Sequence, residues 1–304
     1  MVMRARPRGP RDAPGRVRPR PGRRPRGRPA LRAVGRGLRC AGLVLLAAPL
    51  AVRIALVAIA LVLVWSVANW TYHVIRKPSE LFFPVSGRLT KAPPETWRSY
   101  APLFRRHSTA TITPELLAAL AQVEGAGNPV ARTYWRWQVA WNPFEVYRPA
   151  SSAVGMYQIT NPTFREAKRF CIRDHVVVER GRWHDLKACW FNSLYTRVIP
   201  SHAVELTSAL LDRDVARTLA RRGIATATPR QKQDMAAIIH LCGVGGGDDY
   251  ARRGFRLLSG QQCGDHDVGR YLAQVNAMKR LFARLAASEP AEAALTRGSG
   301  SPRP

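Results

Sequence analysis

From residue 113 the chain reads Thr113-Pro114-Glu115-Leu116-Leu117-Ala118-Ala119-Leu120-Ala121-Gln122-Val123-Glu124-Gly125-Ala126-Gly127-Asn128-Pro129-Val130-Ala131. The first three residues favour a helix start, because threonine can cap free N–H groups, proline suits the first turn, and glutamate interacts well with the positive end of the helix dipole. Apolar residues then recur at helical spacing up to Glu124. The glycines that follow predict the end of the helix. This stretch therefore places one carboxylate at a helix end with open space beside it.

Two further motifs follow along the chain. The first is Ser152-Ala153-Val154-Gly155-Met156-Tyr157-Gln158-Ile159. In it, Gly155 permits close approach of the backbone, and the Gln158 amide can donate and accept hydrogen bonds. The second is His240-Leu241-Cys242-Gly243-Val244-Gly245-Gly246-Gly247. This glycine run lacks the Lys-Ser/Thr of a P-loop, which argues against a phosphate site.

In this order the motifs resemble the catalytic domain of the soluble lytic transglycosylase (goose-lysozyme-like) family, over roughly residues 108–285. The family pattern Glu-Ser-x-x-Asn-Pro-x-Ala is matched by Glu124, Asn128, Pro129 and Ala131, with Gly125 in place of the serine. A Gly-Leu-Met-Gln-like element is matched by Gly155, Gln158 and Ile159, with Met156 and Tyr157 at the apolar positions. A later Tyr-Val-x-x-Val helix is similar to Tyr271-Leu272-x-x-Val275.

One motif departs from the family pattern. The family has Ala-Tyr-Asn-x-Gly, in which the Tyr and Asn support the catalytic Glu and the substrate. The corresponding part of this chain, around residues 240–247, has no Tyr-Asn pair. Two interpretations of His240 are open. It either replaces the missing pair as a hydrogen-bonding partner, or it is a histidine that packs in the core.

The resemblance implies a mostly α-helical, lysozyme-like domain that cleaves peptidoglycan with no metal and no organic cofactor. It implies that Glu124 protonates the oxygen of the β-1,4 bond between N-acetylmuramic acid and N-acetylglucosamine. Glu124 then takes the proton of the muramyl C6 hydroxyl, which attacks C1 and gives a 1,6-anhydro product. The residues expected to bind the glycan strand are Asn128, Trp135, Trp137, Gly155, Tyr157, Gln158, His240 and Tyr271. The two tryptophans come from an aromatic-rich stretch, residues 134–149, whose flat rings suit pyranose faces or core packing.

The first 68 residues predict a tail followed by a membrane anchor. Residues 1–39 hold fourteen Arg and one Asp, and their low apolar content predicts a disordered cytoplasmic tail. Residues 40–68 contain one charge, Arg53, and exceed the about 20 residues that a single transmembrane helix needs. Because the positive charge precedes the span, the rest of the chain is expected in the periplasm, on the inner membrane. A signal peptide with a cleavage site at Ser66-Val67-Ala68 is the alternative.

The remaining residues predict one domain with flanking segments. Prolines interrupt residues 69–107, which predicts a connector without a long helix, although its aromatic residues Trp97, Tyr100 and Phe104 are expected to pack on the domain. The domain covers residues 108–287, with further helices expected at 162–170, 201–222, 229–241 and 268–287. The run Val176-Val177-Val178 favours a strand. Residues 288–304 are expected to form a disordered tail.

Four of the five cysteines lie on the side predicted to be exported. An even number in an oxidising compartment predicts two disulfides, for which three pairings exist. We favour the local pairs, Cys171–Cys189 and Cys242–Cys263. A zinc site that also uses nearby histidines is the alternative, although the spacings fit no standard ligand pattern.

Three other functions fit the sequence. A hydrolytic muramidase would use Glu124 with a second carboxylate, for which Glu145 lies between the first two motifs. A catalytically silent, membrane-anchored peptidoglycan-binding scaffold would account for the missing Tyr-Asn pair. A nucleic-acid binder would use the Arg-rich tail, since the net charge is +28. A tail that only orients the anchor accounts for the same charge, so no nucleic-acid partner is expected.

Overall fold

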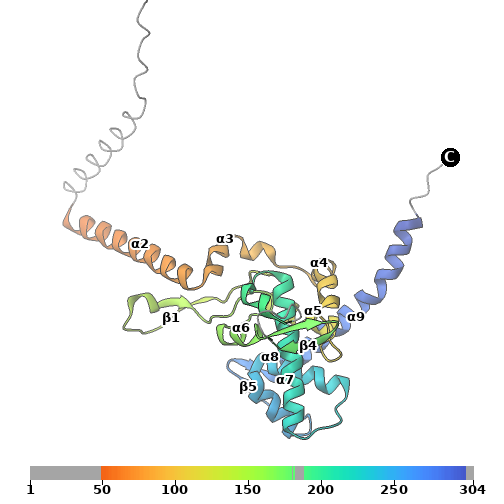
Figure 1. Cartoon of the computed structure of the whole chain (residues 1–304). Helices are drawn as coiled ribbons and strands as arrows, with labels where there is room; N and C mark the ends of the chain where they lie inside the picture. Colours follow the sequence, from red (N-terminus) through yellow and green to blue (C-terminus); the bar gives the residue numbers. More distant parts are fainter. Residues whose placement is uncertain (1–48, 180, 182–187, 299–304) are drawn as a thin grey trace, which may run out of the picture. The chain divides into compact units, whose positions relative to one another are not determined.

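The computed structural model describes residues 49–179, 181 and 188–298 (Figure 1). Helices make up 63% of the structure, which confirms the mostly helical prediction. The chain divides into two compact units, one that ends at Ser66 and one that begins at Val67. The predicted tail at residues 1–39, the first part of the predicted anchor and residues 299–304 lie outside the described residues.

Helix α2 (Leu50–Arg76) covers the part of the predicted anchor from residue 50 onward. It has 27 residues, and its most apolar 18-residue window has a mean hydropathy of 2.6. That length and composition allow it to cross a membrane, and an N-terminal signal sequence would have the same properties. The helix continues past the predicted end at residue 68. Its last turns belong to the second unit, where Asn69 and His73 are buried.

Five helices form the core of the second unit. They are α4 (Pro93–Arg106), α5 (Pro114–Gly125), α7 (Pro200–Arg221), α8 (Pro229–Arg252) and α9 (Val268–Gly298). Helix α5 packs on α4 and α9, and α7 packs on α8. Phe104, Leu120, Ile238 and Phe282 come from four of these helices, and their side chains are fully buried in one cluster. Burial of each contributes about 1.5–3 kcal/mol, so this cluster fixes the position of α5.

The helices predicted after residue 200 are present but have different ends. In α8, Gly243 (φ 72°, ψ 179°) interrupts the helix near the predicted end, and the helix then resumes to Arg252. Helix α9 continues to Gly298, so the prediction of a disordered tail is wrong for residues 288–298. This segment is rich in alanine, which favours helix. In addition, the Glu289 carboxylate accepts a hydrogen bond from Trp97 Nε1 (2.7 Å).

The predicted connector is an integral part of the fold. It contains the 3₁₀ turns Pro78–Phe82 and Gly87–Leu89, the short helix α3 (Phe83–Ser86) and all of α4. The expectation that Trp97, Tyr100 and Phe104 pack on the domain is confirmed, since all three are buried in the main cluster. The absence of a long helix was wrongly predicted, because Pro93 stands at the start of α4, where a proline costs no hydrogen bond.

Three short antiparallel hairpins border the helices. They are β1 (Trp135–Trp137) with β2 (Tyr147–Pro149), β3 (Phe170–Arg173) with β4 (Val176–Glu179), and β5 (Gln262–Cys263) with β6 (His266–Asp267). The strand predicted at Val176-Val177-Val178 is confirmed. Helix α6 (Asn161–Ala167) ends earlier than predicted, because Phe170 is buried and pairs with Glu179 of β4.

Both predicted disulfides are present. Cys171–Cys189 joins β3 to the segment before the 3₁₀ turn Trp190–Leu194, and Cys242–Cys263 joins α8 to β5. The local pairing is thereby confirmed, and the zinc alternative is wrong because all four thiols are used. The cysteines are 18 and 21 residues apart, so closing each loop contributes about 3 kcal/mol in the chain-entropy account.

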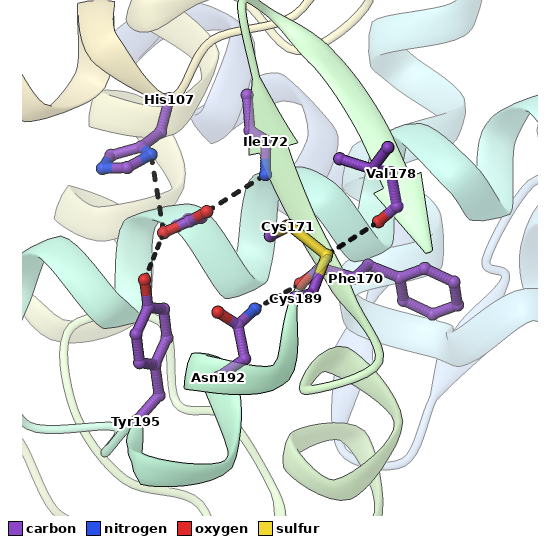
Figure 2. Close-up of a disulfide and its surroundings, with 9 residues drawn as sticks. His107, Phe170, Cys171, Ile172, Val178, Cys189, Asn192 and Tyr195 are labelled. Carbon is purple, nitrogen blue, oxygen red and sulfur yellow. Dashed lines mark hydrogen bonds and ion pairs between the residues drawn. A yellow bond between two sulfur atoms is a disulfide. The ribbon is translucent and has the colours of Figure 1, made fainter. Parts of the chain in front are cut away.

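A buried polar cluster lies beside the first disulfide (Figure 2). The Glu205 carboxylate of α7 accepts hydrogen bonds from the Ile172 N–H (3.0 Å) and the Tyr195 hydroxyl (2.8 Å). Nδ1 of His107 lies 3.8 Å from the same carboxylate. Burial lowers the pKa of His107, and the Glu205 charge partly opposes this effect. The cluster ties α7, β3 and the end of α4 together.

Candidate active site

Helix α5 begins and ends as its sequence predicts. The Thr113 hydroxyl oxygen accepts a hydrogen bond from a backbone N–H of the first turn (3.4 Å). At the other end, Ala126 (φ 48°) and Gly127 (φ 64°) adopt left-handed conformations. The Gly127 N–H returns to the Ala121 carbonyl (3.0 Å), which is a common way to end a helix. Glu124 therefore occupies the last turn of a helix whose end is held in place.

Two side chains from other helices lie at the Glu124 carboxylate. The Tyr271 hydroxyl, near the start of α9, donates a hydrogen bond to Glu124 Oε1 (2.6 Å). Nε2 of His240, in α8, lies 3.7 Å from the same oxygen. The side chains of Glu124 and His240 are 17% and 12% exposed, so the carboxylate is shielded but still reachable from solvent. Three residues selected from separate motifs thus lie together.

Tyr271 is held in its neutral, donating form. Burial first, then the charge of Glu124 and the hydrogen bond to it, raise the pKa of Tyr271 well above its usual range. The phenol therefore keeps its proton at any pH near neutrality. Its hydroxyl fixes one oxygen of Glu124, so Tyr271 is a positioning residue for that carboxylate.

On the expectation that this site cleaves glycan, Tyr271→Phe should lower kcat about 10- to 100-fold with little change in KM. A hydrogen bond to a charged group contributes about 1.5–3 kcal/mol, and here it orients the reacting carboxylate. Steady-state rates of muropeptide release measure both constants. Tyr250→Phe is the matched control, because Tyr250 is also a buried tyrosine of the core. Equal losses for both variants would point to a general packing effect instead.

The first two motifs are in direct contact. The Gly155 N–H donates to the Ala131 carbonyl (2.8 Å), and Gln158 Nε2 donates to the Ala131 and Gly155 carbonyls (3.2 and 2.9 Å). A Cβ atom at Gly125 would lie 2.8 Å from Met156 Cα. Any side chain at this position would therefore collide with the second motif. This close approach accounts for the glycine at position 125.

Two other predicted site residues have their polar atoms engaged within the protein. Asn128 is buried, and its Nδ2 donates to the Ser86 carbonyl (2.6 Å) while its Oδ1 accepts from the Val130 N–H (3.0 Å). The fully buried Tyr157 donates from its hydroxyl to the Leu117 carbonyl (3.2 Å). Both contacts brace the helix end and the turn around Glu124. A direct role in binding substrate stays a prediction for these two residues.

Glu124 is among the residues that line an open cavity of about 350 Å³. Its lining comes from the end of α5 and from the segments around residues 86–90 and 128–132. Glu124 is the one carboxylate among the described residues that line it. Arg132 supplies a positive charge at its edge and pairs with the buried Glu80 (3.1 Å). The cavity therefore offers one acid beside a polar wall.

The tryptophans and the second carboxylate predicted from the sequence lie elsewhere. Trp135 donates from Nε1 to Glu80 (3.0 Å), and Trp137 stacks on Tyr147 across the β1–β2 hairpin. Glu145 pairs with Arg148 (2.7 Å) at the loop end of the same hairpin. None of the three is among the described residues that line the cavity at Glu124. Their roles in substrate binding or hydrolysis stay predictions.

Sequence reasoning missed Asp214 of α7. This residue is 3% exposed and lines a second cavity of about 280 Å³ together with Gln158, His240 and Glu166. Burial, and then the charge of Glu166, raise the pKa of Asp214 to about 6. In the sequence Asp214 is one of several acids along a charged helix. Its periodic position on the apolar face was the only available signal.

We expect Asp214→Asn to stabilise the protein more at pH 8 than at pH 4. The folded-state pKa of about 6 lies above the ordinary aspartate value of 3.8, so the fold favours the protonated acid and loses stability as the pH rises from about 4 to 6. The asparagine would regain up to about 3 kcal/mol above that range. Urea unfolding of the full chain in detergent at both pH values measures the difference. Asp265→Asn, at an exposed position, is the control, and an equal effect of Asp214→Asn at both pH values would contradict the expectation.

No protein-family model, no curated protein and no solved structure matches this chain.

Proposed function

We propose that this chain is a membrane-anchored peptidoglycan lytic transglycosylase in which Glu124 acts as both acid and base. The proposal is carried by one observation, the convergence of three sequence motifs on a single carboxylate. Glu124 ends α5, Tyr271 and His240 reach it from α9 and α8, and the turn at Gly155 packs against the residue that follows it. A shielded carboxylate beside an open cavity has the surroundings that general acid–base chemistry needs.

In the proposed reaction, Glu124 alone gives one proton and takes one back, so no second acid or base is needed. Glu124 gives its proton to the glycosidic oxygen as the bond from muramyl C1 breaks. The resulting carboxylate then takes the proton of the muramyl C6 hydroxyl while O6 bonds to C1, so the acid is regenerated and no water is consumed. A cavity with one carboxylate among its described residues supports this scheme over one that needs two acids.

The domain is proposed to be lysozyme-like and to face the periplasm from the inner membrane. Its support is the helical core around Glu124, the two disulfides typical of an oxidising compartment, and the apolar α2 at the start of the described chain. The substrate-binding residues proposed are the ones selected from the sequence. No metal and no organic cofactor takes part in the proposed reaction.

Mass spectrometry of peptidoglycan digested with the full chain in detergent tests this function. Muropeptides that end in 1,6-anhydro-N-acetylmuramic acid are the expected product. Products with free reducing ends would mean hydrolysis, that is, the muramidase alternative. Binding to peptidoglycan with no release of fragments would identify the silent scaffold.

A further inference from the structure

The β1–β2 hairpin leaves large apolar side chains in solvent. Tyr134 and Trp137 are 68% and 67% exposed, and Val139 and Trp141 at the hairpin tip are fully exposed. In Figure 1 the hairpin projects away from the helical core of the second unit. Exposed apolar groups gathered on a projecting element mark an interaction surface.

The loop end of this hairpin, which also carries Val139 and Trp141, is fixed to the last turns of α2. Asn69 Nδ2 donates to the Tyr147 carbonyl (2.8 Å), His73 Nε2 is hydrogen-bonded to the Phe144 carbonyl (2.8 Å), and Tyr72 stacks on the Phe144 ring. These contacts begin two residues after Val67, where the apolar run of α2 ends. At 1.5 Å per residue, Asn69 to His73 lie about 3–9 Å beyond Val67 along the helix. The polar layer of a bilayer is roughly 5–8 Å deep on each side, so a helix that crosses the membrane would hold the loop end of the hairpin in this layer.

The hairpin has the side chains that this layer favours. The register pairs Trp137 with Tyr147 and Arg136 with Arg148, so one face is aromatic and the other carries two arginines opposite each other. Like charges placed opposite each other are unfavourable unless an anion lies nearby. Arg76 and Arg148 also line a cavity of about 340 Å³, where they share the single carboxylate of Glu145. Lys77 lines the same cavity but pairs with Glu80 (3.1 Å).

An apolar tip, an aromatic face and an arginine face are the features of a membrane-surface anchor. Aromatic rings and cationic side chains are both enriched at the membrane–water interface, and arginine binds phosphate through two donors. A glycan strand is the weaker fit, because the branched side chain of Val139 has no flat face on which a pyranose can stack.

We infer that the β1–β2 hairpin is a membrane-docking element. It seats Val139 and Trp141 in the outer interface of the bilayer that α2 crosses, with Arg136 and Arg148 among the lipid phosphates. The inference rests on the proposed membrane anchor. It adds a second, hairpin-borne attachment, which holds the domain against the membrane and restricts its reach to glycan close to the bilayer.

The test uses the full chain with Cys40 replaced by serine and one new cysteine at a time. The variants are Val139→Cys, Trp141→Cys, Ile59→Cys within α2, and Val176→Cys as a control that is 65% exposed on another hairpin. Each is labelled with an environment-sensitive fluorophore and reconstituted into phosphatidylethanolamine–phosphatidylglycerol vesicles. Labels at 139, 141 and 59 should shift to shorter wavelength and be quenched by spin-labelled lipid, whereas the label at 176 should not respond.

The outcomes separate the hairpin from the anchor. Quenching at 59 with no response at 139 or 141 would overturn membrane docking by the hairpin and leave the anchor standing. No quenching at 59 would remove the anchor, and the docking inference with it. Labels at 139 and 141 that respond to soluble peptidoglycan fragments but not to vesicles would assign the hairpin to the glycan and overturn the inference.

Discussion

Glu124→Gln is expected to lower the rate of anhydro-muropeptide release by about 10³-fold or more. The amide cannot carry a proton to the glycosidic oxygen or take one from the C6 hydroxyl, and a positioned acid–base group contributes about 10²–10⁴ in rate. The glutamine has the shape of glutamate, and its oxygen can still accept the Tyr271 hydrogen bond. The fold and the affinity for glycan should therefore be preserved. Initial rates by mass spectrometry, together with a pull-down on insoluble peptidoglycan, measure both properties.

Glu115→Gln is the matched control for this variant. Glu115 lies in the first turn of the same helix, α5, and receives the same chemical change. Its loss removes only a favourable helix-dipole interaction of about 0.3–1 kcal/mol, so the cleavage rate should not change. Equal activity of wild type and Glu124→Gln would contradict the proposed role. Activity absent from all three proteins would favour the scaffold.

Two kinds of signal allowed parts of the site to be predicted from the sequence. They are helix-forming preferences of neighbouring residues and the order of the motifs along the chain. Thr113, the apolar spacing and the glycines after Glu124 define the helix by interactions within a few residues. The approach of Tyr271 to Glu124 joins positions 147 residues apart, and no periodicity reports such a contact. The resemblance placed Tyr271 among the residues expected to bind the glycan, and it did not predict the hydrogen bond to Glu124. The same resemblance left the role of His240 undecided between a hydrogen-bonding partner and a core histidine. In the structure, His240 lies beside the carboxylate.

The predictions that differ from the structure have one physical cause. In each case, packing against residues far away in the sequence outweighs the local preference of the chain. Prolines around residue 93 were interpreted as breaks, whereas Pro93 begins a helix whose aromatic face completes the core. The segment after residue 287 was interpreted as a tail, but Glu289 bonds to Trp97, far earlier in the chain. The periodic position of Asp214 on the apolar face of α7 is the only local sign that this residue is buried. Each of these features depends on a partner that the neighbouring sequence does not reveal.

Gly155→Ala is expected to cost roughly 3 kcal/mol in the free energy of unfolding and to remove activity. Gly155 has φ +82°, a conformation that strains any other residue by about 1 kcal/mol or more. An added Cβ would also lie 2.4 Å from the Arg197 carbonyl oxygen. That backbone cannot move freely, because the Arg197 guanidinium donates to the carbonyls of Ser152 and Ile159 (2.8 and 2.7 Å) on both sides of the turn. Relief of the overlap would displace the turn that packs against Gly125, the residue after Glu124.

Gly223→Ala separates the two contributions. Gly223 has φ +65°, and no atom lies within 4 Å of where its Cβ would be, so this variant carries the conformational strain without the overlap. It should lose about 1 kcal/mol and keep full activity. Urea unfolding of both variants in detergent gives the difference, which is the cost of the overlap at Gly155. If the two variants lose the same free energy of unfolding, the turn at Gly155 can shift to accept the added Cβ at no extra energy. The close packing of the first two motifs would then not be what holds Glu124 in place.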